Sequence, residues 1–208
     1  RRDAMVKEGK WTFDGFHPGL WGRNAGLIGL GRIGGAMARR LNGQGMKVMV
    51  FDPFLTDEQA KEANVIPVSL DTLLAESDLV SVHAPSTPKT RHILNDAAFA
   101  KMKNSAILIN TSRGPLIDEA ALVRALENGQ IAGAGLDVFE IEPLPAGSPL
   151  RGFSNVVLSP HVSGMDKMAE ERVTGRCVAN ILAWLNGNPS ELTPYVVNPE
   201  TLSAGQES

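Results

Sequence analysis

The chain has 208 residues, of which 43% are hydrophobic and 21% charged, and its net charge is −3 at neutral pH. This composition is typical of a globular domain, and it provides no polycationic surface for nucleic acid or for an anionic membrane. No apolar run reaches the roughly 18 residues that span a bilayer. The single cysteine, Cys177, excludes an internal disulfide and fits a reducing compartment, so we expect a cytoplasmic protein without nucleic-acid or membrane partners.

The N-terminal segment, residues 1–20, has the pattern of a charged helix end followed by a loop rich in glycine and proline at residues 14–19. It has no initiator methionine and no apolar signal segment. We therefore expect the chain to be a fragment of a longer polypeptide, beginning within a helix that connects two domains.

The central segment, residues 21–165, alternates short apolar runs with helical patterns. The predicted strands are residues 24–28, 47–51, 65–68, 79–83, 106–110, 135–138 and 156–158. The predicted helices are residues 33–44, 56–63, 70–75, 96–101 and 118–128. Apolar strands without polar alternation suit a parallel sheet covered on both faces, and the repeated strand–helix order predicts a doubly wound α/β domain.

The C-terminal segment differs from this pattern. Residues 166–187 predict one long amphipathic helix, ended by Gly187 and Pro189. Residues 188–208 are rich in Pro, Ser, Gly and Glu and predict an extended tail that returns toward a second domain.

A glycine fingerprint follows the first predicted strand. Gly29 permits a tight turn, Gly31 lets the backbone approach a pyrophosphate, and Gly34 allows a helix to pack closely while its N-terminal N–H groups face the phosphates. A lone motif of this kind is weak evidence, because a glycine-rich turn beside an unrelated surface acid would have the same letters. Its place between a strand and a helix favours a Rossmann-type dinucleotide site.

Asp52 ends the second predicted strand, 18 residues after Gly34 and close to the roughly 20 expected for the acid that binds the adenosine ribose. A carboxylate there accepts hydrogen bonds from the ribose hydroxyls and repels a 2′-phosphate. The cofactor is therefore predicted to be NAD rather than NADP. Arg32 is an alternative phosphate ligand that would favour NADP, but its position in the fingerprint places it toward the pyrophosphate.

Three later strand ends carry groups that suit the reduction of a 2-oxo acid. Arg113 offers a planar fork to a substrate carboxylate and carbonyl, His161 is a natural proton donor, and a carboxylate in the segment 137–142 would orient the histidine. Each residue alone is compatible with a structural role. Their position at successive ends of strands in one sheet favours catalysis, because ligands of open α/β sheets bind at that edge.

At this point the sequence resembles the D-isomer-specific 2-hydroxyacid dehydrogenase family. The resemblance runs over residues 11–184 and rests on GLIGLGRIG (26–34), VHAPSTPKTRHIL (82–94), INTSRGPLIDEAAL (109–122), GAGLDVFEIEPLP (133–145) and LSPHVSG (158–164). It implies a catalytic trio of Arg113, Glu142 and His161, with Glu142 preferred over Glu140 because the glutamate of the family stands directly before the proline. The residues after His161 depart slightly from the usual Gly and Thr.

The resemblance also implies contacts to NAD, with Thr111 and Asp137 on the nicotinamide side. The full set of expected cofactor-binding residues is Gly29, Gly31, Arg32, Ile33, Gly34, Asp52, Pro53, His83, Ala84, Pro85, Thr90, Thr111, Ser112, Arg113, Asp137, His161 and Gly164. His83 is expected to line the cofactor cleft rather than to act as an acid or base, and His17 and His92 to be surface or loop residues. Four scattered histidines and one cysteine predict no metal site.

In this family the substrate domain comes from the N-terminal hundred or so residues and the extreme C-terminus, so only remnants of it are expected here. The full-length protein is expected to be a homodimer that converts a 2-hydroxy acid to its 2-oxo acid. The alternative is a non-catalytic NAD sensor, such as the corepressors that resemble this family. A relative acting on formate or phosphite is less favoured, because the formate branch would carry glutamine in place of Glu142.

Overall fold

The computed structural model describes residues 2–11 and 19–188. The chain divides into two compact units, Arg1–Pro160 and His161–Ser208, which are described separately. Most of the predicted glycine- and proline-rich loop at residues 14–19 and nearly all of the predicted tail at residues 188–208 lie outside the described residues. The domain boundaries predicted from the sequence therefore stay predictions.

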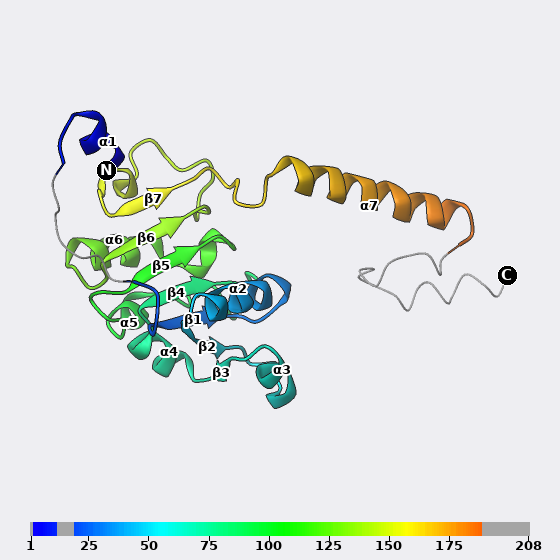
Figure 1. Ribbon diagram of the computed structural model, residues 1–208, viewed down its shortest axis with the longest axis horizontal. Helices are drawn as coiled ribbons and strands as arrows, with labels where there is room; N and C mark the ends of the chain where they lie inside the picture. The colour runs from blue at the N-terminus through cyan, green and yellow to red at the C-terminus, as the bar shows by residue number, and fades with distance from the viewer. Residues whose placement is uncertain (1, 12–18, 189–208) are drawn as a thin grey trace. The chain divides into compact units, whose positions relative to one another are not determined.

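The first unit is built on a seven-stranded sheet in the order β3-β2-β1-β4-β5-β6-β7, in which every pair of neighbours is parallel. The strands are β1 (Asn24–Ile28), β2 (Lys47–Phe51), β3 (Ile66–Pro67), β4 (Leu79–Val82), β5 (Ile107–Asn110), β6 (Gly133–Leu136) and β7 (Val156–Leu158). Figure 1 shows them stacked from β3 at the bottom to β7 at the top. The order 3-2-1-4-5-6 is that of the Rossmann fold, so the predicted fold class is confirmed.

Four strands differ from their predicted ranges, β4 and β5 by one residue at one end. The third predicted strand, residues 65–68, is reduced to Ile66–Pro67 at the edge of the sheet, where a proline without an N–H group is tolerated. The sixth strand begins at Gly133 and ends at Leu136, two residues earlier than predicted. Gly133 fits there because a Cβ atom would lie 2.4 Å from the carbonyl oxygen of Asn155.

Several helices of the first unit begin where the sequence supplies a capping side chain. Thr56 forms a capping box with Gln59, while Ser69 and Asp118 accept hydrogen bonds from backbone N–H groups three residues ahead. The helices of the sheet region are α2 (Arg32–Gly43), α3 (Asp57–Glu62), α4 (Leu70–Glu76), α5 (Asp96–Phe99) and α6 (Glu119–Glu127). The predicted helices are thus confirmed, with ends that shift by one or two residues.

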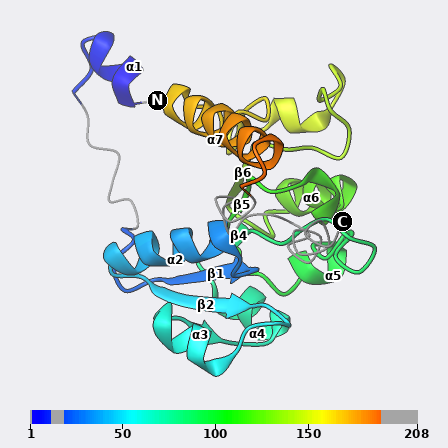
Figure 2. The same cartoon turned by 90° about the vertical axis from the view of Figure 1, so that its right-hand side faces the viewer.

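Alternate residues of β1 belong to two different hydrophobic cores. Ala25 and Leu27 pack with buried residues of α2 and α3, whereas Ile28 packs with α4, α5 and α6. In Figure 2, α2 lies above β1 and β2, and α5 and α6 lie to the right of β4 and β5. Covering both faces explains the uniformly apolar strands and leaves the carboxyl edge of the sheet for polar loops.

The second unit contains α7 (Lys167–Leu185), which lies where the sequence predicts a long helix. Asp166 caps its N-terminus. A further short helix, α1 (Arg2–Lys7), precedes the first unit's sheet in the chain. No helix in the part of the chain that the structure describes is both long and apolar enough to cross a membrane.

Candidate cofactor and active site

The loop after β1 and the loop after β4 meet at the carboxyl edge of the sheet. Ile28 pairs with Val82, the last residue of β4. Gly29 then turns with φ +96°, and a Cβ atom on it would lie 2.9 Å from the backbone nitrogen of Ala84. β1 and β4 are neighbours from which the sheet extends in opposite directions. The fingerprint therefore lies at the switch point where doubly wound sheets bind ligands.

The start of α2 leaves room for a phosphate group. Gly34 packs so closely that a Cβ atom would lie 2.3 Å from the carbonyl oxygen of Gly29. Gly31 is the N-cap, no side chain caps the helix, and a Cβ atom on Gly31 would meet nothing within 4 Å. Arg32 and Ile33 are exposed beside it. This cradle of backbone and open space fits a pyrophosphate at the N-terminus of α2.

The close approach at Gly34 makes a specific prediction. Gly34→Ala is expected to destabilise the fold by about 1–3 kcal/mol, because backbone rather than a movable side chain blocks the new methyl group. It is also expected to weaken NADH binding, because the turn must open to accept the methyl group. Thermal unfolding and NADH titration test both effects. Gly35→Ala is the matched control, since a Cβ atom there meets nothing within 4 Å, and it should leave stability equal or higher.

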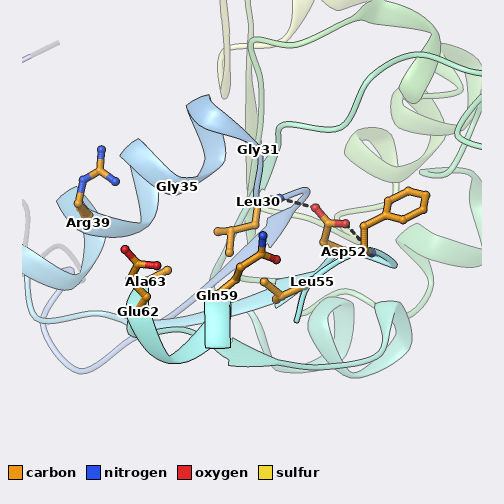
Figure 3. Close-up of a pocket in the computed structure, with 10 residues that line it drawn as sticks. Leu30, Gly31, Gly35, Arg39, Asp52, Leu55, Gln59, Glu62 and Ala63 are labelled. Atoms are coloured by element: carbon orange, nitrogen blue, oxygen red, sulfur yellow. Dashed lines mark hydrogen bonds between the residues drawn. The ribbon is translucent and has the colours of Figure 1, made fainter. Parts of the chain in front are cut away.

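Asp52 is joined to the fingerprint by a hydrogen bond. The Leu30 N–H donates to Oδ2 at 2.8 Å, and the Phe54 N–H donates to Oδ1 at 2.9 Å. Figure 3 shows the carboxylate with both bonds at one end of a pocket between α2 and α3. The pocket has a volume of about 380 Å³ and is lined by Leu30, Gly31, Gly35, Arg39, Asp52, Phe54, Leu55, Gln59, Glu62 and Ala63. The neighbouring Pro53 is exposed in the turn after β2.

The segment after β4 forms the other wall of the switch point. The Thr90 hydroxyl donates to the Pro85 carbonyl at 2.7 Å, which closes the loop that carries both residues. The His83 ring shares a hydrogen bond of 3.0 Å with the Ser81 hydroxyl. Burial lowers the pKa of His83, which favours the neutral ring at physiological pH. Its role as a lining residue of the cofactor cleft stays a prediction.

Arg113 stands in a loop that buried Asn110 shapes. The Asn110 amide donates to the Arg113 carbonyl at 3.0 Å, and its Oδ1 accepts from the Ser112 N–H at 3.0 Å. The Ser112 hydroxyl donates to the Ala84 carbonyl at 2.8 Å, which ties this loop to the end of β4. The exposed Thr111 and Arg113 are thus presented at the same edge of the sheet as the fingerprint.

Asp137 follows β6 and is almost completely buried, with 2% of its surface exposed. The Ser159 hydroxyl, just after β7, donates to Oδ1 of Asp137 at 2.5 Å. The Asp137 N–H donates to the Asn110 carbonyl at 3.0 Å, so the ends of β5, β6 and β7 are joined around this carboxylate.

Glu142 lies in the exposed loop after β6, where its Oε1 accepts from the Phe139 N–H at 3.0 Å. Its rival Glu140 is engaged elsewhere. His92 Nε2 lies 2.5 Å from Oε1 of Glu140, and the Glu119 N–H donates to Oε2 at 3.3 Å. In turn, Oε1 of Glu119 accepts a hydrogen bond from the Glu140 N–H. His92 is thus a partly buried hydrogen-bond partner of Glu140 rather than a bare surface residue, and the preference for Glu142 stays a prediction.

Burial raises the pKa of Glu119 above its usual 4.5, and the nearby Glu140 and Glu142 carboxylates raise it further, against a lowering hydrogen bond from the Glu140 N–H. A raised folded-state pKa contributes stability below the unfolded pKa, and that contribution is lost as pH rises through the folded pKa. Glu119→Gln keeps an acceptor for Glu140 and removes the charge. We expect its free energy of unfolding at pH 7 to exceed that of wild type by less than about 1 kcal/mol, with the advantage vanishing near pH 4.

Unfolding curves of both proteins from pH 4 to pH 7.5 measure this difference. A variant that is less stable than wild type by the same amount at every pH would show that the Glu119 carboxylate is stabilising and that its burial costs nothing.

His161 opens the second unit, two residues beyond Ser159, and has a left-handed backbone with φ +56°. Gly164 follows it in the same exposed segment. The structure describes Arg113 and Glu142 together in the first unit and His161 in the second. The assembly of the trio is therefore a proposal.

Two groups that position the site are not among the residues predicted from the sequence. Asn110 falls in a predicted strand, and an asparagine directly before a polar loop is a signal for hydrogen bonds from its side chain to the backbone of that loop. The Leu30 N–H has no such signal, because any residue supplies it. Among the described residues, no group of three or more His, Cys, Asp or Glu is placed to hold a metal ion.

The chain is similar to known proteins over most of its length. The NAD-binding domain model of the D-isomer specific 2-hydroxyacid dehydrogenases matches residues 1–163. A glyoxylate reductase of Korarchaeum cryptofilum is 42% identical over 206 residues, covering 96% of this chain and 61% of the reductase. The chain thus spans about three fifths of the length of this curated relative.

Solved structures share the fold. A D-lactate dehydrogenase of Aquifex aeolicus, complexed with NAD and lactic acid, has a TM-score of 0.81 at 31% identity, covering 93% of this chain and 65% of that one. An acyclic imino acid reductase in complex with NADPH and D-arginine has a TM-score of 0.80 at 30% identity, covering 90% and 59%. The chain belongs to the D-isomer specific 2-hydroxyacid dehydrogenase family, and it contains that family's NAD-binding domain.

Proposed function

We propose that this chain is the cofactor half of an NAD-dependent dehydrogenase that interconverts a D-2-hydroxy acid and its 2-oxo acid. The observation that carries the proposal is the convergence of the fingerprint, Asp52 and the Arg113 loop on one edge of the sheet. The Ser112–Ala84 hydrogen bond of 2.8 Å links the Arg113 loop to the loop that touches Gly29. The residues proposed to bind the cofactor and those proposed to bind the substrate therefore lie in connected loops at the carboxyl edge of the sheet, which we call the rim.

The proposed cofactor contacts follow from this rim. The N–H groups at the start of α2 would hold the pyrophosphate, with Arg32 and Ile33 beside it, and Asp52 would hold the adenosine ribose. The loop carrying Pro85 and Thr90 would cover the adenosine side. Thr111 and Asp137 would lie toward the nicotinamide, which supplies a hydride when the reduced cofactor is bound.

The substrate chemistry is assigned to three side chains. Arg113 would fix the substrate carboxylate and polarise its carbonyl through charge-assisted hydrogen bonds. His161 would give its proton to the carbonyl oxygen as hydride reaches the carbonyl carbon, so that the 2-oxo acid becomes a 2-hydroxy acid. Glu142 would orient the imidazole and favour its protonated form, because an adjacent carboxylate stabilises the imidazolium.

The whole protein is proposed to carry a substrate domain and to act as a homodimer in the cytoplasm. The substrate domain would close over the rim, because hydride transfer needs both reactants held in a closed and dry cleft. This chain alone is therefore expected to bind NADH and to show little turnover.

The test is NADH oxidation by the protein with its substrate domain, measured against glyoxylate, hydroxypyruvate, pyruvate and phosphohydroxypyruvate. Turnover of at least one 2-oxo acid is expected. NADH binding without turnover of any of them would instead support the alternative, a non-catalytic NAD sensor.

A further inference from the structure

We propose that Glu140 is a positioning residue of the reaction, whose carboxylate holds the loop that carries Glu142 against the segment that follows Arg113. Glu142 and Arg113 are the two proposed catalytic residues of the first unit, and they stand after different strands, β6 and β5. This role rests on the proposed function and adds the group that fixes the spacing between these two side chains. Glu140 acts through Glu142 and not by touching the substrate or the cofactor.

Both carboxylate oxygens of Glu140 are held by other segments of the chain. Oε1 lies 2.5 Å from Nε2 of His92, in the segment after β4. Oε2 accepts a hydrogen bond at 3.3 Å from the N–H of Glu119, the first residue of α6, where a helix has no partner of its own for the N–H. The His92 and Glu140 side chains are only 30% and 24% exposed. A contact shielded from water in this way keeps more of its strength than an exposed ion pair does.

The backbone of Glu140 is held at the same place. Its N–H donates to Oε1 of Glu119, which forms a reciprocal pair with the bond from the Glu119 N–H. One residue earlier, Phe139 is buried, and its N–H donates to Oε1 of Glu142 at 3.0 Å. The orientation of the Glu142 carboxylate therefore depends on backbone that Glu140 and Glu119 hold in place.

The partners of the Glu140 carboxylate lead directly to the Arg113 loop. The His92 N–H donates at 2.8 Å to the carbonyl of Pro115, which follows Gly114 in that loop. Gly114 is buried, and a Cβ atom on it would overlap the carbonyl group of the residue before Glu140. The carboxylate and the packing at Gly114 therefore fix the same two loops relative to each other.

Several charged groups face the Glu140 carboxylate. Arg91 lies 3.5 Å from Oε1, but it is mostly exposed and so contributes little. Burial raises the pKa of Glu119, and the nearby Glu140 and Glu142 carboxylates raise it further, so these acids repel one another. Acids grouped against their own repulsion are typical of functional sites. The hydrogen bonds of Glu140 to His92 and to the backbone hold it there against this repulsion.

Three substitutions separate position from charge. Glu140→Ala removes the carboxylate and both of its bonds. His92→Asn leaves every acid in place, but its amide ends one bond nearer the backbone than Nε2 does and so falls short of Glu140. Asparagine also tolerates the left-handed backbone of His92, whose φ is +51°. Asp96→Asn is the matched control, because it removes a carboxylate from another ion pair of α6, the one with Arg124.

The first measurement is kcat of the protein with its substrate domain, per site titrated with NADH, for the 2-oxo acid that wild type reduces fastest. Glu140→Ala is expected to lower kcat about 10- to 100-fold, because a displacement of about 1 Å in an acting group has effects of that size. His92→Asn is expected to lower kcat about three- to tenfold, because the bond from the Glu119 N–H remains. In the Glu140→Ala background it should add less than about twofold, since the contact that it breaks is already absent.

The binding constants should change much less than kcat. KM for the oxo acid and the NADH dissociation constant are expected to stay within about threefold of wild type in every variant, because Arg113 and the fingerprint are unaltered. Asp96→Asn should match wild type in all three quantities. A merely structural role of Glu140 would reduce the number of NADH-binding sites and leave kcat per site unchanged.

Amide hydrogen exchange of this chain gives a readout that needs no turnover. The Phe139 N–H, which donates to Glu142, is expected to exchange at least about tenfold faster in Glu140→Ala than in wild type, because its loop opens more often. Amides of β1 should keep their wild-type rates, which excludes a general loss of stability. His92→Asn carries both measurements if Glu140→Ala does not fold.

Several results would overturn the proposal. These are wild-type kcat in Glu140→Ala, equal losses in Glu140→Ala and Asp96→Asn, or wild-type kcat in His92→Asn, which would leave charge as the only effect. Unchanged exchange of the Phe139 amide would contradict it whether or not the protein turns over. Wild-type protein that binds NADH but reduces no 2-oxo acid would instead contradict the proposed function.

Discussion

Replacing His161 by alanine in the protein with its substrate domain is expected to lower kcat/KM by about a thousandfold, the usual contribution of a general acid. The dissociation constant of NADH should stay within about twofold of wild type, because the fingerprint, Asp52 and the Ala84 loop belong to the first unit. Stopped-flow reduction of the preferred 2-oxo acid and NADH fluorescence titration measure the two quantities.

His161→Gln serves as the companion variant, because its amide can donate a hydrogen bond but cannot release a proton. It is expected to keep the wild-type KM more closely than alanine does and to remain as slow. Equal losses of NADH binding and of turnover in both variants would mean that His161 supports the fold instead of the chemistry.

The single substitution Arg113→Ala is expected to reduce kcat/KM about 100- to 1,000-fold, since it removes charged hydrogen bonds to the substrate. The Asn110 side chain makes two hydrogen bonds to backbone atoms of the loop, so the loop should keep its conformation without the guanidinium group. Arg113→Lys should recover only a small part of the loss, because an ammonium group lacks the planar fork that matches a carboxylate.

The measurement is steady-state kinetics with the substrate concentration varied at saturating NADH. Full recovery in Arg113→Lys would show that only charge is needed at this position. Loss of NADH affinity in Arg113→Ala, with KM for the oxo acid unchanged, would move Arg113 from the substrate to the cofactor.

Most of the sheet could be predicted because its strands are apolar and bounded by clear loop signals. β1, β2 and β7 have the predicted bounds, and the ends of β4 and β5 shift by one residue. β3 loses one residue at each end and β6 begins and ends two residues earlier, since the bounds of these strands depend on their neighbours. Pairing of β2 reaches only Ile66 and Pro67, and Gly133 joins β6 because it pairs with Ile107.

The positions of the fingerprint glycines and of Asp52 at the carboxyl edge of the sheet could be predicted, because each directly follows an apolar strand. Their binding of NAD stays a prediction. What the sequence could not supply was the set of long-range partners. The bond from Leu30 to Asp52 joins residues 22 apart, and the His92–Glu140 pair joins residues 48 apart. Such contacts arise from the order of strands in the sheet, which spacing along the chain does not encode.

The central claim is that NAD binds at the carboxyl edge of this sheet, around the fingerprint. The most direct measurement is an amide NMR titration of the chain with NADH. We expect saturable shifts confined to the backbone of residues 29–34, 52–54, 83–85 and 110–113. Saturable shifts that leave residues 29–34 and 52–54 unmoved, or no saturable shifts at all, would contradict it.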